Sequence, residues 1–201
     1  MILLFLLPLF VLASEHCEYS YTVWNTQMRK AEGPFKVNKP YSSLGPQEKG
    51  PFGCTPCEQD QQEIVLKSGL KVKICRHLAS AMEKNLNEIL KSGFRITSLT
   101  GYRTSISKGS PDSAGRRTKF SHHAFGAAID INEEFNGLYD HCLTWGPGCR
   151  LIKGGRYIPG GPGSISPQSS VISIMNSSKF QWGGSISGLQ KDFMHFSSDG
   201  Y

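Results

Sequence analysis

Two short stretches of the chain combine histidines with carboxylates at apolar positions. Residues 121–132 read SHHAFGAAIDIN, so that Asp130 stands between two isoleucines, seven residues after His123. The stretch KDFMHF places His195 three residues after Asp192, again among apolar residues. Buried carboxylates are rare unless they are paired or bind a metal. These spacings indicate either a metal centre or a set of ordinary buried polar groups.

A catalytic zinc site usually takes three protein ligands from His, Asp, Glu or Cys and keeps one position for water. His123, Asp130 and His195 provide two imidazoles and one carboxylate for such a site, and the metal would neutralise the carboxylate between the isoleucines. Asp192 has the type and spacing of a general base. The residues alone leave an alternative open, in which Asp130 caps a turn and His195 is a core imidazole with satisfied hydrogen bonds.

The other histidines are interpreted as side chains that do not bind the metal. His16 lies in a polar N-terminal stretch, His77 occupies a polar helix position, and His141 adjoins a cysteine. His122 lies beside a candidate ligand and is expected to be an exposed neighbour or a contact of the ligands.

Composition limits the classes of partner. The chain has 201 residues and a formal charge of +6, without repeats or low-complexity segments. This length allows one domain with a sizeable core. The basic stretch RRTK at 116–119 is short and no long Lys/Arg run is present, so nucleic acid is not an expected partner. A mild positive charge suits an anionic wall polymer or a membrane surface.

Residues 1–13 are predicted to be a secretory signal peptide. The segment is apolar and ends in small residues, and it is shorter than the ~20 residues needed to span a bilayer. We therefore expect a secreted or periplasmic protein, without stable membrane insertion after signal cleavage, that acts as a monomer.

Six cysteines, an even number in an exported chain, predict three disulfides. Cys142 and Cys149 flank a Gly/Pro turn and are expected to pair. The sequence CTPC at 54–57 could be redox-active or half of a zinc site, but no second CxxC follows, which favours a structural role. The remaining expected pairs are Cys57 with Cys75 and Cys17 with Cys54.

Apolar periodicity predicts an α+β fold, with a small, mainly antiparallel sheet and flanking helices. Residues 14–57 are predicted to be an irregular, cysteine-containing extension, and residues 58–201 a single domain. Within this domain the expected elements are a hairpin over 63–75, a helix over 76–93, strands over 94–103 and 124–131, a polar loop over 104–120, a short helix opened by Ser166 and Pro167, and a final strand over 191–196.

Four motifs occur in a fixed order: GYR at 101–103, Ser-x-His-x-x-Gly-x-Ala-x-Asp at 121–130, WGG at 182–184 and DFMHF at 192–196. With these motifs the chain resembles the VanY-type D-alanyl-D-alanine carboxypeptidases and the related L-alanyl-D-glutamate endopeptidases of bacteria and phages. Their fold is shared by the zinc-binding domain of hedgehog proteins. The resemblance covers roughly residues 58–201 and implies a zinc peptidase domain that acts on peptidoglycan stem peptides.

The resemblance also implies roles for individual residues. It implies Zn²⁺ bound by His123, Asp130 and His195, and Asp192 as the catalytic base. It also implies that Arg103 binds the substrate, that Ser121 orients the motif loop or the substrate, and that Trp182 forms a wall of the site.

Two departures from the family pattern affect the substrate. Many relatives have a Gln in a GYRSxxxQ arrangement, which GYRTSISKGS lacks. The base is Asp where the VanY branch typically has Glu, which favours the endopeptidase branch without deciding between the two bonds. Two other classes stay as alternatives: an inert zinc-containing binding or signalling module, in which Asp192 and Arg103 would have no use, and a disulfide-stabilised toxin or inhibitor, against which the length and the apolar helix argue.

Overall fold

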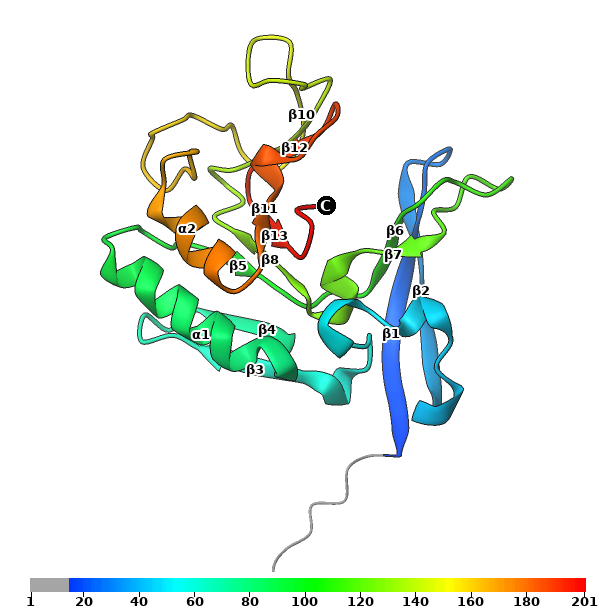
Figure 1. Cartoon of the computed structure of the whole chain (residues 1–201). Coiled ribbons are helices and arrows are strands. Elements are labelled where there is room, and N and C mark those ends of the chain that lie inside the picture. The colour runs from blue at the N-terminus through cyan, green and yellow to red at the C-terminus, as the bar shows by residue number, and fades with distance from the viewer. Residues whose placement is uncertain (1–14) are drawn as a thin grey trace, which may run out of the picture.

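Four small sheets and two α-helices make up residues 15–201, the part of the chain that this computed structural model describes (Figure 1). Most strand pairs are antiparallel. The predicted α+β class is therefore confirmed, while the likeness to the hedgehog fold stays a prediction. The predicted signal peptide lies outside the described residues.

One sheet, here called the ribbon sheet, contains the two long strands of the N-terminal segment. Its strands follow the order β2–β1–β6–β7, and β1 pairs in parallel with β6. The prediction of an irregular extension over 14–57 is wrong, because two long strands run through it. Strand β2 is almost entirely exposed, so its residues include Gly, Pro and Lys instead of alternating apolar ones. The bounds are β1 His16–Asn25, β2 Lys30–Pro40, β6 Ser105–Lys108 and β7 Lys119–Phe120.

This sheet also joins the two predicted parts of the chain. Strands β6 and β7 come from 104–120, which was predicted to be a loop, and β6 pairs with the N-terminal β1 through Thr22 opposite Ser105 and Val23 opposite Ile106. The proposed boundary near residue 58 therefore runs through a continuous structure. A pairing between such distant residues has no local signal in the sequence.

Disulfides fasten the segment that follows the ribbon. Short 3-10 turns occupy Tyr41–Ser43, Pro46–Glu48, Pro51–Gly53 and Glu58–Asp60. The structure confirms Cys142–Cys149 but corrects the other two pairs, which are Cys17–Cys57 and Cys54–Cys75. The first joins β1 to the turns, and the second joins the turns to the end of β4. Three disulfides are typical of extracellular or periplasmic proteins.

The predicted hairpin and helix are both present. Strands β3 (Gln61–Val65) and β4 (Lys71–Cys75) pair with each other, and helix α1 (Arg76–Lys91) follows directly. Met82, Leu86 and Ile89 lie on one face of α1 and are fully buried. This apolar face anchors the helix in the main core.

A second sheet, here called the site sheet, lies at the centre of the molecule (Figure 1). Its order is β11–β13–β8–β5, and every residue of β8 is buried. The predicted strand over 94–103 is reduced to the two residues of β5, and the predicted strand over 124–131 begins only at Ala128. The bounds are β5 Leu99–Thr100, β8 Ala128–Ile131, β11 Gln181–Trp182 and β13 His195–Ser197.

The remaining elements border the site sheet. A third sheet has the order β10–β9–β12, and the predicted final strand is split between β12 and β13. The short helix α2 begins after Ser169, whose hydroxyl accepts a hydrogen bond from the Val171 amide. The bounds are β9 Leu138–Asp140, β10 Arg150–Lys153, β12 Lys191–Asp192, α2 Ser170–Ser177, and 3-10 turns at His122–Phe125 (η5) and Gly183–Ser185 (η6).

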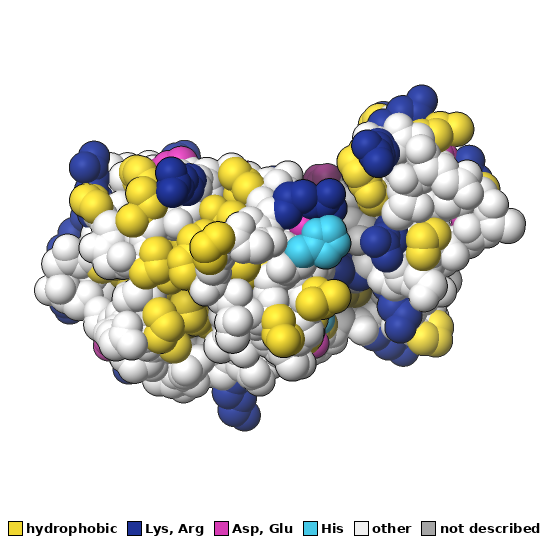
Figure 2. Space-filling view, turned by 90° about the horizontal axis from the view of Figure 1, so that it is seen from above, with side chains coloured by type: hydrophobic (Ala, Val, Ile, Leu, Met, Phe, Trp, Pro, Cys, Tyr) yellow, Lys and Arg dark blue, Asp and Glu magenta, His cyan; other side chains and the backbone are white. Residues whose placement is uncertain are grey.

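The surface divides into two unequal lobes, and the smaller lobe contains the ribbon sheet (Figures 1 and 2). The main hydrophobic cluster lies in the larger lobe, whereas a small cluster around Cys17, Tyr19 and Cys57 supports the ribbon. Among residues 15–201, no helix has the length and apolar character needed to cross a membrane.

Candidate metal centre

Three buried side chains converge on one point of the site sheet. His123 Nε2 lies 3.0 Å from Asp130 Oδ1, His195 Nδ1 lies 2.9 Å from the same oxygen, and the two nitrogens are 3.1 Å apart. Ligand atoms of a tetrahedral site with bonds of ~2.0–2.1 Å are about 3.3 Å apart. The triangle therefore needs only a small expansion to coordinate a metal ion, and the two imidazoles and one carboxylate suit a divalent ion such as zinc.

The site sheet and one turn fix this convergence. His195 on β13 stands directly opposite Asp130 on β8 in an antiparallel pair. His123 lies in η5, which ends at Gly126 with a φ of 61°. A side chain at this glycine would clash with Gln61 Oε1 and with the backbone amide of Cys75. Only glycine therefore lets the turn pass from His123 into β8 so close to strand β4.

Backbone carbonyl groups orient both imidazoles by contacting the ring nitrogens that point away from the common point. His123 Nδ1 lies 2.7 Å from the carbonyl oxygen of Gly101, and His195 Nε2 lies 3.3 Å from that of Tyr201. When these outer nitrogens carry the proton, Nε2 of His123 and Nδ1 of His195 present lone pairs to the common point. A second hydrogen bond of this kind is the usual support of histidines that bind metals.

Burial and charge set the protonation of the cluster. Burial lowers the pKa of His123 below its ordinary value, against the pull of Asp130, and so favours the neutral imidazole. Burial alone would raise the pKa of Asp130, but the charges and hydrogen bonds of the two histidines hold it well below its usual range. Burial would also lower the pKa of His195, yet its hydrogen bond to Asp130 and the nearby carboxylates raise it. A neutral His123 and an ionised Asp130 are the forms that bind metal, whereas His195 releases a proton on binding.

Arg103 supports the carboxylate from its other side. Its Nη2 lies 3.3 Å from Asp130 Oδ2, and its side chain is 42% exposed. Its backbone amide also donates to the carbonyl oxygen of His123 at 3.1 Å. Two residues earlier, Gly101 packs so closely that any side chain would clash with the carbonyl oxygen of Lys73. The GYR motif thus fixes one ligand by its backbone and another by a guanidinium group that still faces solvent.

Asp192 lies at the end of β12 and has one oxygen without a hydrogen bond. Its Oδ1 is buried and has no partner within the described residues. Burial, with the charge of Asp130, raises the pKa of Asp192 to about 6, while His195, Lys108 and Lys153 oppose the rise. A half-buried carboxylate with an unpaired oxygen and a raised pKa can accept a proton and release it again.

Trp182 is buried close to the strands that carry Asp192 and His195. The indole is only 3% exposed, and this burial favours a supporting role over an open wall of the site. Its Nε1 donates to the carbonyl oxygen of Phe193 at 2.8 Å, and this bond fixes the turn between Asp192 and His195. Trp182 therefore positions the strand ends that hold the base and a ligand.

Two further residues flank the first ligand. Ser121 begins η5 and is buried, and its hydroxyl has no hydrogen-bond partner within the described residues. His122 is half-buried, with Nδ1 3.4 Å from Asp199 Oδ1, and it is not one of the three converging residues. The structure thus places His122 as a neighbour of the ligands, as expected.

Sequence reasoning missed Asn132, a polar residue whose hydrogen bonds support the end of strand β8 in the site sheet. Asn132 follows β8 with a positive φ of 52°, and its fully buried amide binds the backbone of two separate segments. Its Nδ2 donates to the carbonyl oxygens of Arg95 and Gly163 at 2.7 and 3.0 Å, and its Oδ1 accepts from the Thr97 amide at 2.8 Å. An asparagine directly after a buried strand is a usable signal, because Asn tolerates this backbone region and bonds nearby backbone groups.

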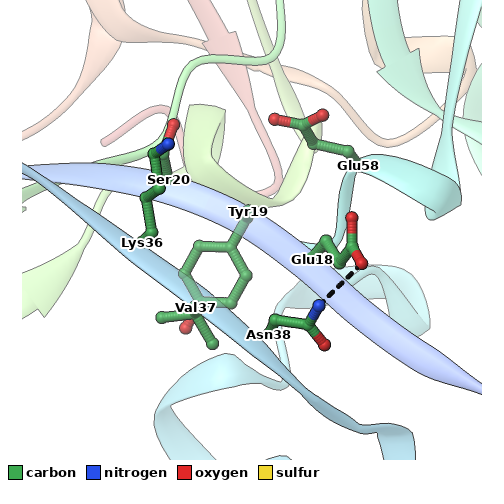
Figure 3. Close-up of a pocket in the computed structure, with 7 residues that line it drawn as sticks. All are labelled: Glu18, Tyr19, Ser20, Lys36, Val37, Asn38 and Glu58. Carbon is green, nitrogen blue, oxygen red and sulfur yellow. Dashed lines mark hydrogen bonds between the residues drawn. The ribbon is translucent and has the colours of Figure 1, made fainter.

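An open hollow of about 380 Å³ lies elsewhere, on the ribbon sheet (Figure 3). Across it, the Asn38 amide donates to Glu18 Oε1 at 2.8 Å. The hollow shares no residue with the metal centre, so the candidate ligands and the candidate base do not line it. It is lined by Glu18, Tyr19, Ser20, Lys36, Val37, Asn38 and Glu58.

Comparison with known proteins agrees with this geometry. No curated protein and no solved structure matches the chain. Residues 114–198, a range that includes the three candidate ligands and Asp192, match the family model described as D-alanyl-D-alanine carboxypeptidase, and this match confirms the resemblance to that family of zinc peptidases.

Proposed function

We propose that this chain is a secreted or periplasmic zinc peptidase, active as a monomer, that hydrolyses peptide bonds in the stem peptides of peptidoglycan. The observation that carries the proposal is the convergence of His123, Asp130 and His195, with the unpaired carboxylate oxygen of Asp192 on β12, the strand that precedes β13 in the chain. The family match over 114–198 supports the peptidase class and the substrate.

In this proposal the three converging atoms hold the metal. A zinc ion bound there would polarise a substrate carbonyl group and lower the pKa of water to about 7. The protein supplies one negative charge through Asp130 and two neutral imidazoles, so the centre keeps a net positive charge. That charge is what makes the site attractive to a carbonyl oxygen on which negative charge develops.

Asp192 moves the proton. At neutral pH a carboxyl group with a pKa of about 6 is mainly ionised, so it can accept a proton from the attacking water. The same group can then protonate the leaving amine. A positive ion in the centre would lower this pKa further, which keeps Asp192 in the accepting form before each reaction.

In this proposal Arg103 positions the substrate, and Trp182 positions the strand ends that carry Asp192 and His195. The exposed part of the Arg103 guanidinium can bind a carboxylate or the carbonyl oxygen of the substrate, while its Nη2 contacts the ligand Asp130. The buried Trp182 holds the turn before His195. Ser121, with its unpaired hydroxyl beside η5, is the nearest side chain that could orient the motif loop.

The experiment combines metal analysis with mass spectrometry of digested muropeptides. His123→Ala should lose both zinc and hydrolysis, because one of three ligands is removed. Asp192→Asn should keep zinc and lose roughly 10²- to 10⁴-fold in kcat, as expected when a general base is removed. His122→Ala is the matched control, because the neighbouring histidine lies outside the triangle and should keep both properties.

The products identify the bond. Loss of a terminal D-alanine would define a carboxypeptidase, whereas cleavage after the first L-alanine would define an endopeptidase. A wild-type protein that binds one zinc but cleaves no muropeptide would overturn the peptidase proposal in favour of a binding module. If Asp192→Asn retained its turnover, Asp192 would not be the general base, and the proposal of the metal centre would be unaffected.

A further inference from the structure

The positive charge of the chain is concentrated in the ribbon sheet. Residues 15–40 and 103–120 contain nine Lys or Arg and four Asp or Glu, a balance of +5 out of +6 for the whole chain. Residues 121–201, which contain the three candidate ligands, have five basic and six acidic side chains, a balance of −1. The smaller lobe is thus cationic, although the metal centre lies mainly in the other one.

Most of these cations have no acidic partner. Within the described residues, ion pairs join Lys39 to Glu48, Arg116 to Glu32 and Arg103 to Asp130. Arg117 is partly buried and donates to the carbonyl oxygen of Gly109. Five cations of the ribbon sheet remain that are exposed and form no ion pair there: Arg29, Lys30, Lys36, Lys108 and Lys119.

Their spread requires a long partner. Lys30 and Lys36 lie at the two ends of a seven-residue stretch of β2, and the six steps between them span about 20 Å at the rise of a β-strand. Lys119 lies on β7, at the opposite edge of the same sheet. A single small anion cannot contact cations so far apart, whereas a polymer with repeated negative groups can follow them around the lobe.

The apolar side chains of the lobe argue against a membrane as this partner. Trp24 is 38% exposed and points away from its buried neighbours Val23 and Asn25. Phe35 is 43% exposed and packs on Tyr21, on the sheet face that contacts Phe120. The two exposed rings therefore lie on opposite faces, so they do not form one apolar face that could insert into lipid.

The cationic lobe is continuous with the metal centre. Strand β6 begins two residues after Arg103 and ends with Lys108. Ser105 on this strand accepts a hydrogen bond from the amide of Ser121, at the start of η5. A polymer bound along the lobe would therefore lie beside the centre.

We propose that the ribbon sheet is a docking surface for a linear anionic glycopolymer with phosphodiester groups in its backbone. Its five unpaired cations bind successive phosphates, and the exposed Trp24 and Phe35 contact the polyol or sugar units between them. This binding does not require the peptidase activity, and it holds the centre close to a surface that carries the polymer.

The test uses synthetic poly(glycerol phosphate) as the probe and fluorescence anisotropy as the readout, over a range of salt concentrations. The ribbon variant combines Arg29→Gln, Lys30→Gln, Lys36→Gln and Lys119→Gln. The control variant removes one Arg and three Lys from the larger lobe, all exposed and without an ion pair within the described residues: Lys67→Gln, Lys91→Gln, Arg95→Gln and Lys179→Gln. Both variants lose four positive charges, so they differ only in position.

The ribbon variant should bind the probe roughly 10- to 1,000-fold more weakly and with a smaller salt dependence, since each cation near an anionic surface contributes on this scale. The control variant should stay within about threefold of the wild type. Equal losses in both variants would show an effect of net charge alone and overturn the proposal.

Two other probes separate the competing partners. Equal affinity for polyglutamate would overturn the phosphodiester assignment, and binding to phosphatidylglycerol vesicles without binding to the polymer would replace it with a membrane. Thermal unfolding and hydrogen exchange in β1 and β2 serve as the check of folding in each variant. Polymer binding by a protein that cleaves no muropeptide would support this proposal while the peptidase proposal failed.

Discussion

The site sheet and the ribbon sheet are stabilised in different ways. All four residues of β8 are buried, and its polar neighbours Asn132 and Asn136 use their amides to bind surrounding backbone. In the ribbon sheet no residue of β2 is buried, and support comes from a disulfide and a small cluster around Tyr19. Core packing therefore fixes the geometry of the centre, whereas a covalent link and a small local cluster fix the ribbon.

This difference predicts that the ribbon can be opened while the centre stays formed. Cys17→Ala with Cys57→Ala removes a link across 40 residues, which in the chain-entropy account contributes about 4 kcal/mol. Hydrogen exchange should become fast in β1 and β2, while zinc binding persists. Thermal unfolding and zinc content measure the two halves of the prediction.

The control for this change is the third disulfide. Cys142→Ala with Cys149→Ala opens a link across only seven residues and should cost about 2 kcal/mol, without faster exchange in β1. Loss of zinc from the first variant would contradict the comparison, because it would show that the centre depends on an intact ribbon.

The converse change weakens the site sheet and leaves the ribbon intact. Asn132→Ala removes four or more hydrogen bonds from a buried position and keeps a side chain at a positive φ. Groups left unpaired in a core are costly, and we expect a loss of about 3 kcal/mol in the free energy of unfolding with weaker zinc binding. Urea denaturation and zinc titration provide the measurements.

Asn132→Gly separates the two causes. Glycine adopts a positive φ without strain but lacks the amide, so a loss close to that of the alanine variant would assign the effect to the hydrogen bonds. A glycine variant as stable as the wild type would instead show that the buried amide contributes nothing.

The same contrast explains how far the sequence could predict the structure. Helix α1 and the β3–β4 hairpin follow from local periodicity, because buried apolar residues mark these elements. The candidate ligands stand in apolar runs, but their choice as a set came from the resemblance to a family and not from spacing alone. The ribbon has no such signal, since an exposed strand with Lys, Gly and Pro resembles a loop. Its pairing with β6 joins residues about eighty positions apart, which no local pattern encodes.

The pairing of four cysteines and the role of Trp182 depend on the fold for a related reason. Four cysteines beyond the Cys142–Cys149 loop allow three pairings, and only the fold brings Cys17 to Cys57 and Cys54 to Cys75. A tryptophan in a motif near the ligands can line a site or support it. The burial that decides between these roles depends on how β11 packs against β13.

The smallest expected effect concerns the ionic support of the ribbon. Glu48 accepts hydrogen bonds from the Tyr19 hydroxyl at 2.5 Å and from Lys39 Nζ at 2.6 Å. Burial opposes ionisation, but these bonds and one from the Gly45 amide hold the pKa of Glu48 below its ordinary value of 4.5. Its contribution to stability is therefore fully present above pH 4.5 and is lost as the pH falls through the lower folded pKa.

Glu48→Gln should accordingly lower the Tm at about pH 6 by a few degrees, and the difference from the wild type should shrink as the pH approaches about 3. Glu83→Gln, at an exposed position of α1, is the control and should follow the wild type throughout. A Tm difference that does not change with pH would mean that packing of the side chain, and not the ionised carboxylate, stabilises the ribbon. In that case the ribbon would resemble the site sheet more closely than its exposed strands suggest.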